Sequence, residues 1–224
     1  MKLNKVLIIA THFDDETYGC GGTIQKFKNL GKKIYLLVIS DPSGYVFNKK
    51  KLATRYSEIK KVKKFYKFDK IFELRYPASQ LYKIDKTKFI NDTKKIINQI
   101  KPDTIIMNHY NDAHSDHREV FQNMRYLMKP FRFNYIKNIF LMEIPSETDQ
   151  GLILVKDTFK PSLFVDISKF IDLKIKALKI YKSQILNSPN SRNVETIRSL
   201  SRLRGGQSGY KFAEAFQILR GSID

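Results

Sequence analysis

Two short segments bring histidine and carboxylate side chains together at spacings that suit a metal ion. In HFDD, His12 and Asp15 are three residues apart, and in HSDH, His114 and His117 have the same spacing. At the first turn of a helix, residues three apart share a face. Two imidazoles and a carboxylate suit Zn²⁺, and three protein ligands leave a fourth position open for water. The two segments therefore indicate a catalytic zinc site.

In such a site the additional carboxylates beside the metal can have chemical roles. The metal would lower the pKa of a bound water and polarise a substrate carbonyl, while one carboxylate acts as general base and another orients a histidine. Taken singly, the residues have plainer interpretations, since Asp14, Asp15, Asp112 or Ser115 can each cap a helix. Cys20 is interpreted as a small packed residue. The combination is more specific than any member.

Apolar runs that alternate with amphipathic segments must position these residues. Strands are predicted at residues 5–10, 33–40, 70–76, 103–109 and 134–144. Helices are predicted at residues 16–30, 54–66, 86–100, 115–128 and 168–186, with a last helix from about 210, after a glycine-containing loop at 205–209. This order predicts an α/β fold: a Rossmann-like, mostly parallel sheet with helices on both faces. Active sites of such sheets lie at the carboxyl ends of the strands, where both segments fall.

Length and composition favour one globular domain over residues 1–224. The hydrophobic content of 42% suffices for a core, and no run of eighteen apolar residues predicts a membrane-spanning helix. The apolar run near the N-terminus ends in charged residues rather than in a cleavage site, so it is interpreted as a first strand. The single cysteine excludes an internal disulfide, and a cytoplasmic location is expected.

The net charge of +19 has two interpretations. It can reflect an anionic partner, such as nucleic acid, an anionic membrane surface or a phosphorylated substrate. It can also reflect a lysine-rich composition, with lysines on the solvated faces of helices such as 60–70, and this interpretation is favoured. There is no helix-turn-helix or RNA-recognition motif and no tryptophan, so a nucleic-acid partner is not expected.

Several segments resemble the PIG-L/LmbE family of zinc-dependent N-deacetylases. ATHFDDETYGCGGTI (10–24) resembles the first family signature, and DAHSDHREV (112–120) is similar to the second. Further similar segments lie at 54–66, 165–184 and 209–220, so the resemblance spans almost the whole chain. The chain departs from the pattern at Thr11, Phe13 and Tyr181, and at 76–81, which lacks an acidic residue.

The resemblance implies a role for each residue of the two signatures. The zinc ligands would be His12, Asp15 and His117. Asp14 would be the general base for the attacking water. His114 would stabilise the oxyanion and protonate the leaving amine.

Residues around this centre receive supporting roles from the same resemblance. Asp116 would orient His114 and keep it cationic when needed. Arg55 would reach the substrate, and Glu58 would fix the helix that carries both residues. The segment RLRGGQ (202–207) is a weaker candidate for contact with an anion. The alternative interpretation is a solvent-exposed connection between helices.

The implied reaction is removal of an N-acetyl group from an amino sugar, nucleotide- or lipid-linked sugars included. The expected partner is thus a small amino-sugar substrate, either neutral or anionic, with one Zn²⁺ per chain, and the oligomeric state, a homo-oligomer included, is left open. One alternative is a zinc amidase that cleaves a different amide. Another is a non-enzymatic anion- or nucleic-acid-binding protein with structural zinc, although a structural site needs four protein ligands and only three good ones are present.

Overall fold

A seven-stranded sheet organises the computed structural model, which describes residues 3–45, 48–152 and 156–223. Its strands are β1 (Lys5–Ala10), β2 (Lys33–Asp41), β3 (Lys70–Pro77), β4 (Thr104–Asn108), β5 (Asn138–Met142), β6 (Leu163–Asp166) and β7 (Ala213–Arg220). The spatial order is β3-β2-β1-β4-β5-β7-β6. The first five strands in this order are parallel, whereas β7 runs antiparallel to both of its neighbours. The predicted α/β class with a mostly parallel sheet is confirmed.

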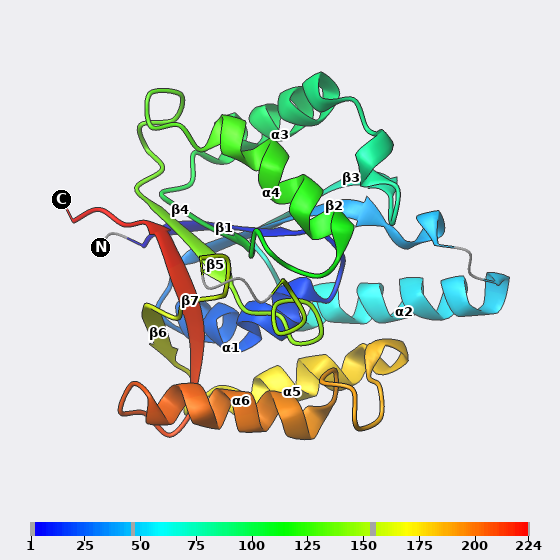
Figure 1. Cartoon of the computed structure of the whole chain (residues 1–224), viewed down its shortest axis with the longest axis vertical. Helices are drawn as coiled ribbons and strands as arrows, with labels where there is room; N and C mark the ends of the chain where they lie inside the picture. The colour runs from blue at the N-terminus through cyan, green and yellow to red at the C-terminus, as the bar shows by residue number, and fades with distance from the viewer. Residues whose placement is uncertain (1–2, 46–47, 153–155, 224) are drawn as a thin grey trace.

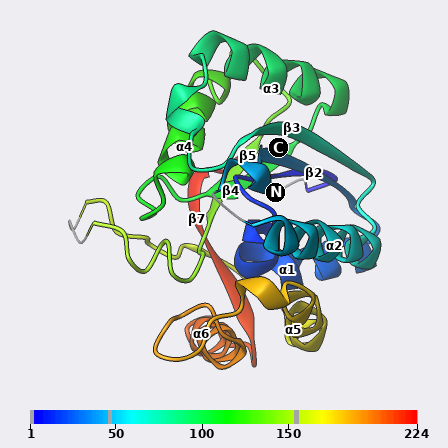
Figure 2. The same cartoon turned by 90° about the vertical axis from the view of Figure 1, so that its right-hand side faces the viewer.

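Helices cover both faces of the sheet (Figure 1). They are α1 (Asp15–Asn29), α2 (Lys49–Tyr66), α3 (Lys86–Ile100), α4 (Ser115–Leu127), α5 (Ile171–Ile180) and α6 (Val194–Gly206), with short 3-10 helices η1 (Pro42–Gly44), η2 (Leu81–Lys83) and η3 (Lys182–Gln184). Figure 2, turned by 90°, also places α3 and α4 on one side and α1, α2, α5 and α6 on the other. None of the described helices is long and apolar enough to cross a membrane.

The sheet has a hydrophobic core on each face because its central strands are apolar on both sides. In β1, Val6 and Ile8 join the core beneath α1 and α5, whereas Leu7 and Ile9 join the core beneath α3 and α4. All four are at most 1% exposed. Strands buried on both faces read as continuous apolar runs, which explains why the sequence predicted them well.

The prediction of a last helix from about residue 210 was wrong. Residues 213–220 form β7, which pairs with β5 and β6. The segment AEAFQILR has no strong local preference for a strand. Pairing on both sides satisfies its backbone groups and buries Ala213, Ala215 and Phe216, so tertiary contacts outweigh local propensity.

Other helix boundaries also differ from the predicted ones. The helix predicted at 168–186 ends at Ile180 as α5 and is followed by η3. Residues 202–206, proposed as a loop that contacts an anion, belong to α6, and Arg204 pairs with Glu143. Leu30, the last residue of the helix predicted at 16–30, is 56% exposed just beyond α1.

Candidate metal centre

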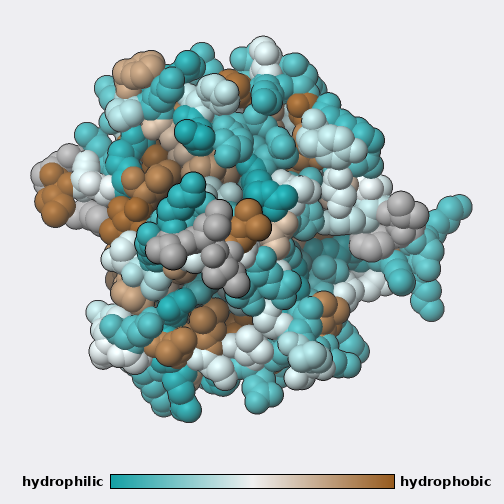
Figure 3. Space-filling view, in the orientation of Figure 1, coloured by the Kyte–Doolittle hydropathy of each residue, from teal (hydrophilic) through white to brown (hydrophobic). Residues whose placement is uncertain are grey.

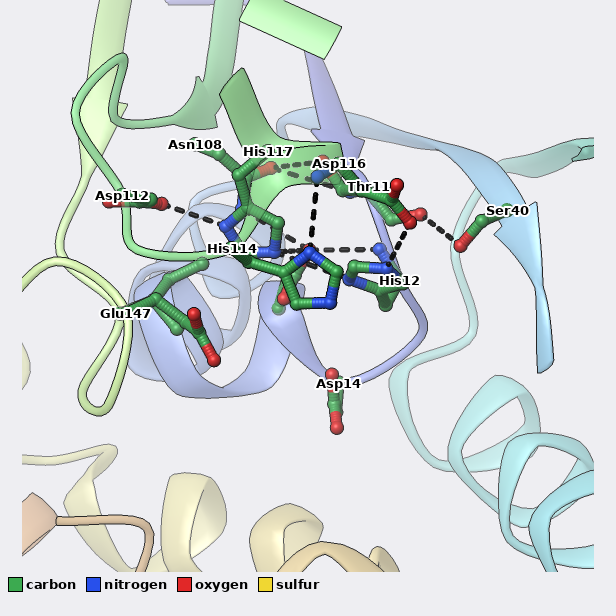
Figure 4. Close-up of polar contacts among 12 residues, drawn as sticks. Thr11, His12, Asp14, Ser40, Asn108, Asp112, His114, Asp116, His117 and Glu147 are labelled. Atoms are coloured by element: carbon green, nitrogen blue, oxygen red, sulfur yellow. Dashed lines mark hydrogen bonds and ion pairs between the residues drawn. The ribbon is translucent and has the colours of Figure 1, made fainter. Parts of the chain in front are cut away.

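The two signature segments meet at the carboxyl ends of β1 and β4, which are neighbours in the sheet. The chain leaves β1 toward β2 on one side and leaves β4 toward β5 on the other, so the strand order reverses between them. Such a switch point leaves a crevice in open α/β sheets. His12 and His117, which are 105 residues apart in the sequence, come into contact there, as Figure 4 shows.

Three side-chain atoms form a compact triangle in this crevice. His12 Nδ1 lies 3.2 Å from His117 Nε2 and 3.9 Å from Asp15 Oδ2, and the third edge, from His117 Nε2 to Asp15 Oδ2, measures 3.4 Å. Ligands about 2.0–2.1 Å from a tetrahedral zinc ion lie roughly 3.3–3.4 Å apart. The predicted ligand set therefore fits a zinc ion in size and chemistry.

Each histidine of the triangle has a carboxylate at its other ring nitrogen. Asp116 Oδ2 lies 3.2 Å from His12 Nε2, and Asp112 Oδ2 lies 2.8 Å from His117 Nδ1. Such carboxylate–histidine pairs fix the ring orientation and the tautomer of a metal ligand. Asp112, interpreted from sequence as a helix cap, instead supports His117. Its position five residues before His117 was the only signal for this role.

The protonation preferences of the triangle show why a cation suits it. Burial alone raises the pKa of Asp15, but the neighbouring His117 and His12 lower it well below its ordinary value. Burial alone lowers the pKa of His117, but Asp15 and Asp112 raise it well above its ordinary value. The buried carboxylates thus demand positive charge, which a divalent cation supplies.

A second group of possible ligands, His12, His114 and Asp116, overlaps the first. The Asp116 carboxylate already accepts hydrogen bonds from the backbone N–H groups of Ser79 (2.6 Å) and Leu81 (3.3 Å). These bonds hold it behind His12. The first group is therefore the better metal site.

Asp14 occupies a strained backbone position that turns its carboxylate away from the helix end. Its φ is 119°, and it precedes α1 without a side-chain capping bond. Its backbone carbonyl accepts from Thr17 and Tyr18, so the backbone alone performs the capping. Its amide N–H donates to Glu16 Oε2 (2.9 Å). The carboxylate consequently lines the cavity.

Two arginines hold the same oxygen of this carboxylate. Arg55 Nη2 lies 3.0 Å and Arg192 Nη2 lies 2.7 Å from Asp14 Oδ2. The structure records no partner for Oδ1 among the described residues. The arginines therefore fix the carboxylate plane and leave Oδ1 available.

The Arg55 side chain was predicted to contact the substrate, but most of its contacts are with other residues of the protein. It also donates to the backbone oxygen of Phe13 and stacks over the ring of Tyr181, 4.9 Å away. It lines the cavity but is only 5% exposed. Glu58 accepts from the backbone and hydroxyl of Ser183, so it does fix α2 as expected.

His114 lines the cavity beside the triangle and favours the neutral state. Burial, together with the neighbouring His12 and His117, lowers the pKa of His114 to about 4. Its Nδ1 accepts a hydrogen bond from the backbone N–H of Asp116 (3.1 Å), so the ring proton belongs on Nε2. The expected contact between Asp116 and His114 thus runs through the Asp116 backbone, because the carboxylate faces His12. The negative charge of Asp116 acts to raise the pKa of His114, but burial and the two neighbouring histidines outweigh it.

His109 lies apart from the metal triangle although it follows the same strand. Its Nε2 contacts Gln217 Oε1 at 3.1 Å, and its ring packs against Tyr110 and Phe159. The residue is 1% exposed. Of the four histidines in the chain, His109 is the one that lies outside the metal cluster.

The cavity has a volume of about 290 Å³. Its polar lining combines predicted residues with others that sequence reasoning missed: His12, Asp14, Asp15, Arg55, His114 and His117 were predicted, whereas Ser40, Tyr45, Glu147, Gln184 and Arg192 were not. Ser40 lies near the end of β2 and Gln184 in η3, whereas Tyr45, Glu147 and Arg192 lie in loops, and none of the five belongs to a recognisable motif.

Comparison with known proteins agrees with this geometry. Residues 7–127, more than half of the chain, match the PIG-L family model, described as GlcNAc-PI de-N-acetylase. The chain belongs to the PIG-L family. The matched span contains both signature segments and Arg55, whereas Glu147 and Arg192 lie beyond it.

This PIG-L protein is similar over nearly its whole length to known deacetylases. It is 24% identical to diacetylchitobiose deacetylase of Thermococcus kodakarensis, with 98% of this chain and 84% of the relative covered. The N,N'-diacetylchitobiose deacetylase structure from Pyrococcus horikoshii has a TM-score of 0.74 at 23% identity, covering 97% of this chain and 84% of that one.

The same fold also occurs in an enzyme of another class. The structure of GalB, the 4-carboxy-2-hydroxymuconate hydratase of Pseudomonas putida KT2440, has a TM-score of 0.74 at 14% identity, covering 99% of this chain and 98% of that one. The fold alone therefore does not select a reaction.

Proposed function

We propose that this protein is a zinc-dependent hydrolase that removes the N-acetyl group from an N-acetylated amino sugar. The observation that carries the proposal is the Asp14 carboxylate, held in the same cavity as the His12, Asp15 and His117 triangle. When bound, zinc would supply an activated water and polarise the amide carbonyl. Family membership and the similarity to diacetylchitobiose deacetylase support an amino-sugar substrate.

Asp14 serves as the general base in this proposal. Its Oδ1 accepts a proton from the attacking water, while Arg55 and Arg192 hold Oδ2. The carboxyl group then delivers this proton to the amide nitrogen as the carbon–nitrogen bond breaks. The second proton of the water stays on the new carboxyl group, so the products are acetic acid and the neutral amine, and transfer of that proton to the amine gives acetate and an ammonium group.

His114 stabilises the negative charge that develops on the carbonyl oxygen. A neutral imidazole with its proton on Nε2 is a hydrogen-bond donor, and this nitrogen lies 3.3 Å from the Tyr45 hydroxyl in the wall of the cavity. This role does not need the cationic imidazole that sequence reasoning assigned to His114. Asp14 rather than His114 is therefore the proton donor to the leaving amine.

An amidase with a different substrate is the second candidate, because the metal centre suits any amide. A hydratase such as GalB adds water to its substrate and would release no acetate. Acetate release from a panel of N-acetylated sugars separates these reactions, because only the deacetylase forms acetate and a free amine. N-acetylglucosamine, N,N'-diacetylchitobiose and a nucleotide-linked N-acetylglucosamine would form the panel.

Asp14→Asn tests the assignment of the base. The amide cannot accept the proton, so kcat should fall by about 10²- to 10⁴-fold. Zinc content, measured by elemental analysis, should remain at the wild-type level because Asp14 lies outside the ligand triangle. Near-normal turnover in the zinc-loaded variant would refute the role of Asp14, and absence of acetate from every wild-type reaction would refute the function.

A further inference from the structure

Glu147 and Arg192 form a charged pair inside the cavity that the reaction described above does not fully use. Glu147 follows β5, and Arg192 precedes α6, so two separate loops contribute the pair. Arg192 Nη1 lies 3.6 Å from Glu147 Oε1, and both side chains are about 15% exposed (15% and 14%). Both line the cavity that contains Asp14 and His114.

Hydrogen bonds to the segment that carries Asp112, beside the proposed metal ligand His117, hold Glu147 in place. Thr148 Oγ1 donates to Asp112 Oδ1 (2.7 Å), and Asp112 in turn contacts His117. The backbone oxygen of Glu147 accepts from Ala113 (2.9 Å). Figure 4 shows the Glu147 side chain beside His114, on the side of the cluster toward Asp14. Its position relative to the metal triangle is thus fixed by the fold.

Arg192 is equally well positioned. Its guanidinium lies 4.5 Å from the centre of the Tyr18 ring, and Tyr18 Oη donates to the backbone oxygen of Gln184 (3.0 Å). Its Nη2 is engaged by Asp14, which leaves Nη1 facing Glu147 at a distance beyond hydrogen-bond reach.

A donor and an acceptor placed side by side suit a hydroxyl group, which both donates and accepts hydrogen bonds. Within the described part of the chain, the Glu147 carboxylate accepts one hydrogen bond, from the adjacent Ser146 hydroxyl at 3.3 Å. A sugar hydroxyl can donate to Glu147 and accept from Arg192 at once. We propose that Glu147 and Arg192 bind one ring hydroxyl of the substrate and so determine which sugars the enzyme accepts.

This inference rests on the proposed deacetylase function. It adds a consequence, because Arg192 touches Asp14 as well as the proposed hydroxyl site. In this arrangement the Arg192 guanidinium contacts both the sugar hydroxyl and Asp14, the proposed general base. Recognition of the hydroxyl is therefore linked to the position of the reacting amide.

A comparison of deoxy sugars tests the pair. The probes are N-acetylglucosamine and its 3-, 4- and 6-deoxy analogues, and calorimetry measures their binding to zinc-loaded Asp14→Asn protein, in which turnover does not interfere. Loss of the recognised hydroxyl should weaken binding by about 10- to 100-fold for one analogue, because it leaves buried charged partners unsatisfied.

Adding Glu147→Ala to this protein should abolish that discrimination. The penalty for the same analogue should fall to within about threefold, since two changes that remove one interaction are not additive. Glu147→Gln, which keeps the size of the side chain, should give an intermediate penalty and serves if the alanine variant folds poorly. The affinities of the other two analogues relative to N-acetylglucosamine should not change.

Glu143→Ala is the matched control. Glu143 pairs with Arg204, both side chains are 14% exposed, and neither lines this cavity. This variant should retain wild-type discrimination. Equal binding of all four sugars, or unchanged discrimination after loss of Glu147, would overturn the inference. Absence of acetate release by the wild-type enzyme would instead count against the deacetylase function.

Discussion

At the residue scale, the centre depends on side chains that do not touch the metal. His117 offers Nε2 to the ligand triangle because its Nδ1 faces the Asp112 carboxylate at 2.8 Å, with the Asn108 amide 3.0 Å from the same nitrogen. Asp112 is fully buried and also accepts from Thr148. A buried carboxylate with these two partners fixes both the histidine and the loop that carries Glu147.

Asp112→Ala should weaken zinc binding by about 10- to 100-fold, because His117 loses the partner that sets its tautomer and orientation. Competition with a chromogenic chelator measures the affinity. Asp92→Ala is a suitable control, since Asp92 pairs with Lys88 on the surface of α3. An unchanged zinc affinity in Asp112→Ala would show that His117 is oriented by other contacts.

At the element scale, α1 consists of two helical segments joined at Cys20, whose φ and ψ are −146° and 24°. The backbone N–H groups of Gly22 and Thr23 donate to the two oxygens of Glu214, on β7. Lys174, on α5, donates to Glu214 (2.6 Å) and to the backbone oxygen of Tyr18 (2.8 Å). This buried pair joins the kinked helix to β7 and α5 and provides partners for the backbone N–H groups of Gly22 and Thr23 at the break in α1.

Lys174→Met should lower the free energy of unfolding by about 3–5 kcal/mol, because it leaves the Glu214 carboxylate buried without its counter-charge. Urea denaturation measures the loss. The double variant Lys174→Met, Glu214→Gln should recover part of it, since the amide removes the uncompensated charge. If the single variant were as stable as wild type, the pair would not hold these elements together.

At the scale of the whole molecule, the fold gathers negative charge into one crevice of a strongly basic chain. The net charge is +19, yet Asp14, Asp15, Asp112 and Asp116 are all at most 2% exposed around the metal triangle. The surface in Figure 3 is largely hydrophilic, with apolar side chains in separate patches. The buried carboxylates of this centre thus favour binding of a cation there, although the protein as a whole is positively charged.

Metal binding should therefore stabilise the whole fold. A ligand present at 100 times its dissociation constant adds about 2.7 kcal/mol to the free energy of unfolding. Calorimetry should show a higher Tm with zinc than after removal of metal by a chelator. His117→Ala protein should show little of this difference, and an equal zinc-dependent shift in that variant would place the metal elsewhere.

Much of this protein could be predicted from sequence because the relevant signals are local. Apolar runs such as β1 and β4 are buried on both faces, and their order along the chain specifies a parallel sheet. The spacing within HFDD and HSDH also indicated one metal centre, because both follow strands whose carboxyl ends share an edge. Residue type, short spacing and strand order sufficed for these predictions.

The tertiary structure alone decided the features that depend on distant partners. Residues 213–220 are a strand because β5 and β6 lie on either side, although their own sequence did not predict it. Asp14 and Arg192, 178 residues apart, meet only after the loop before α6 packs over α1. His109 and His117 follow the same strand, yet only His117 faces the centre. Sequence specifies which chemical groups are available, whereas packing determines which of them share a buried space, because contact between distant residues has no local pattern.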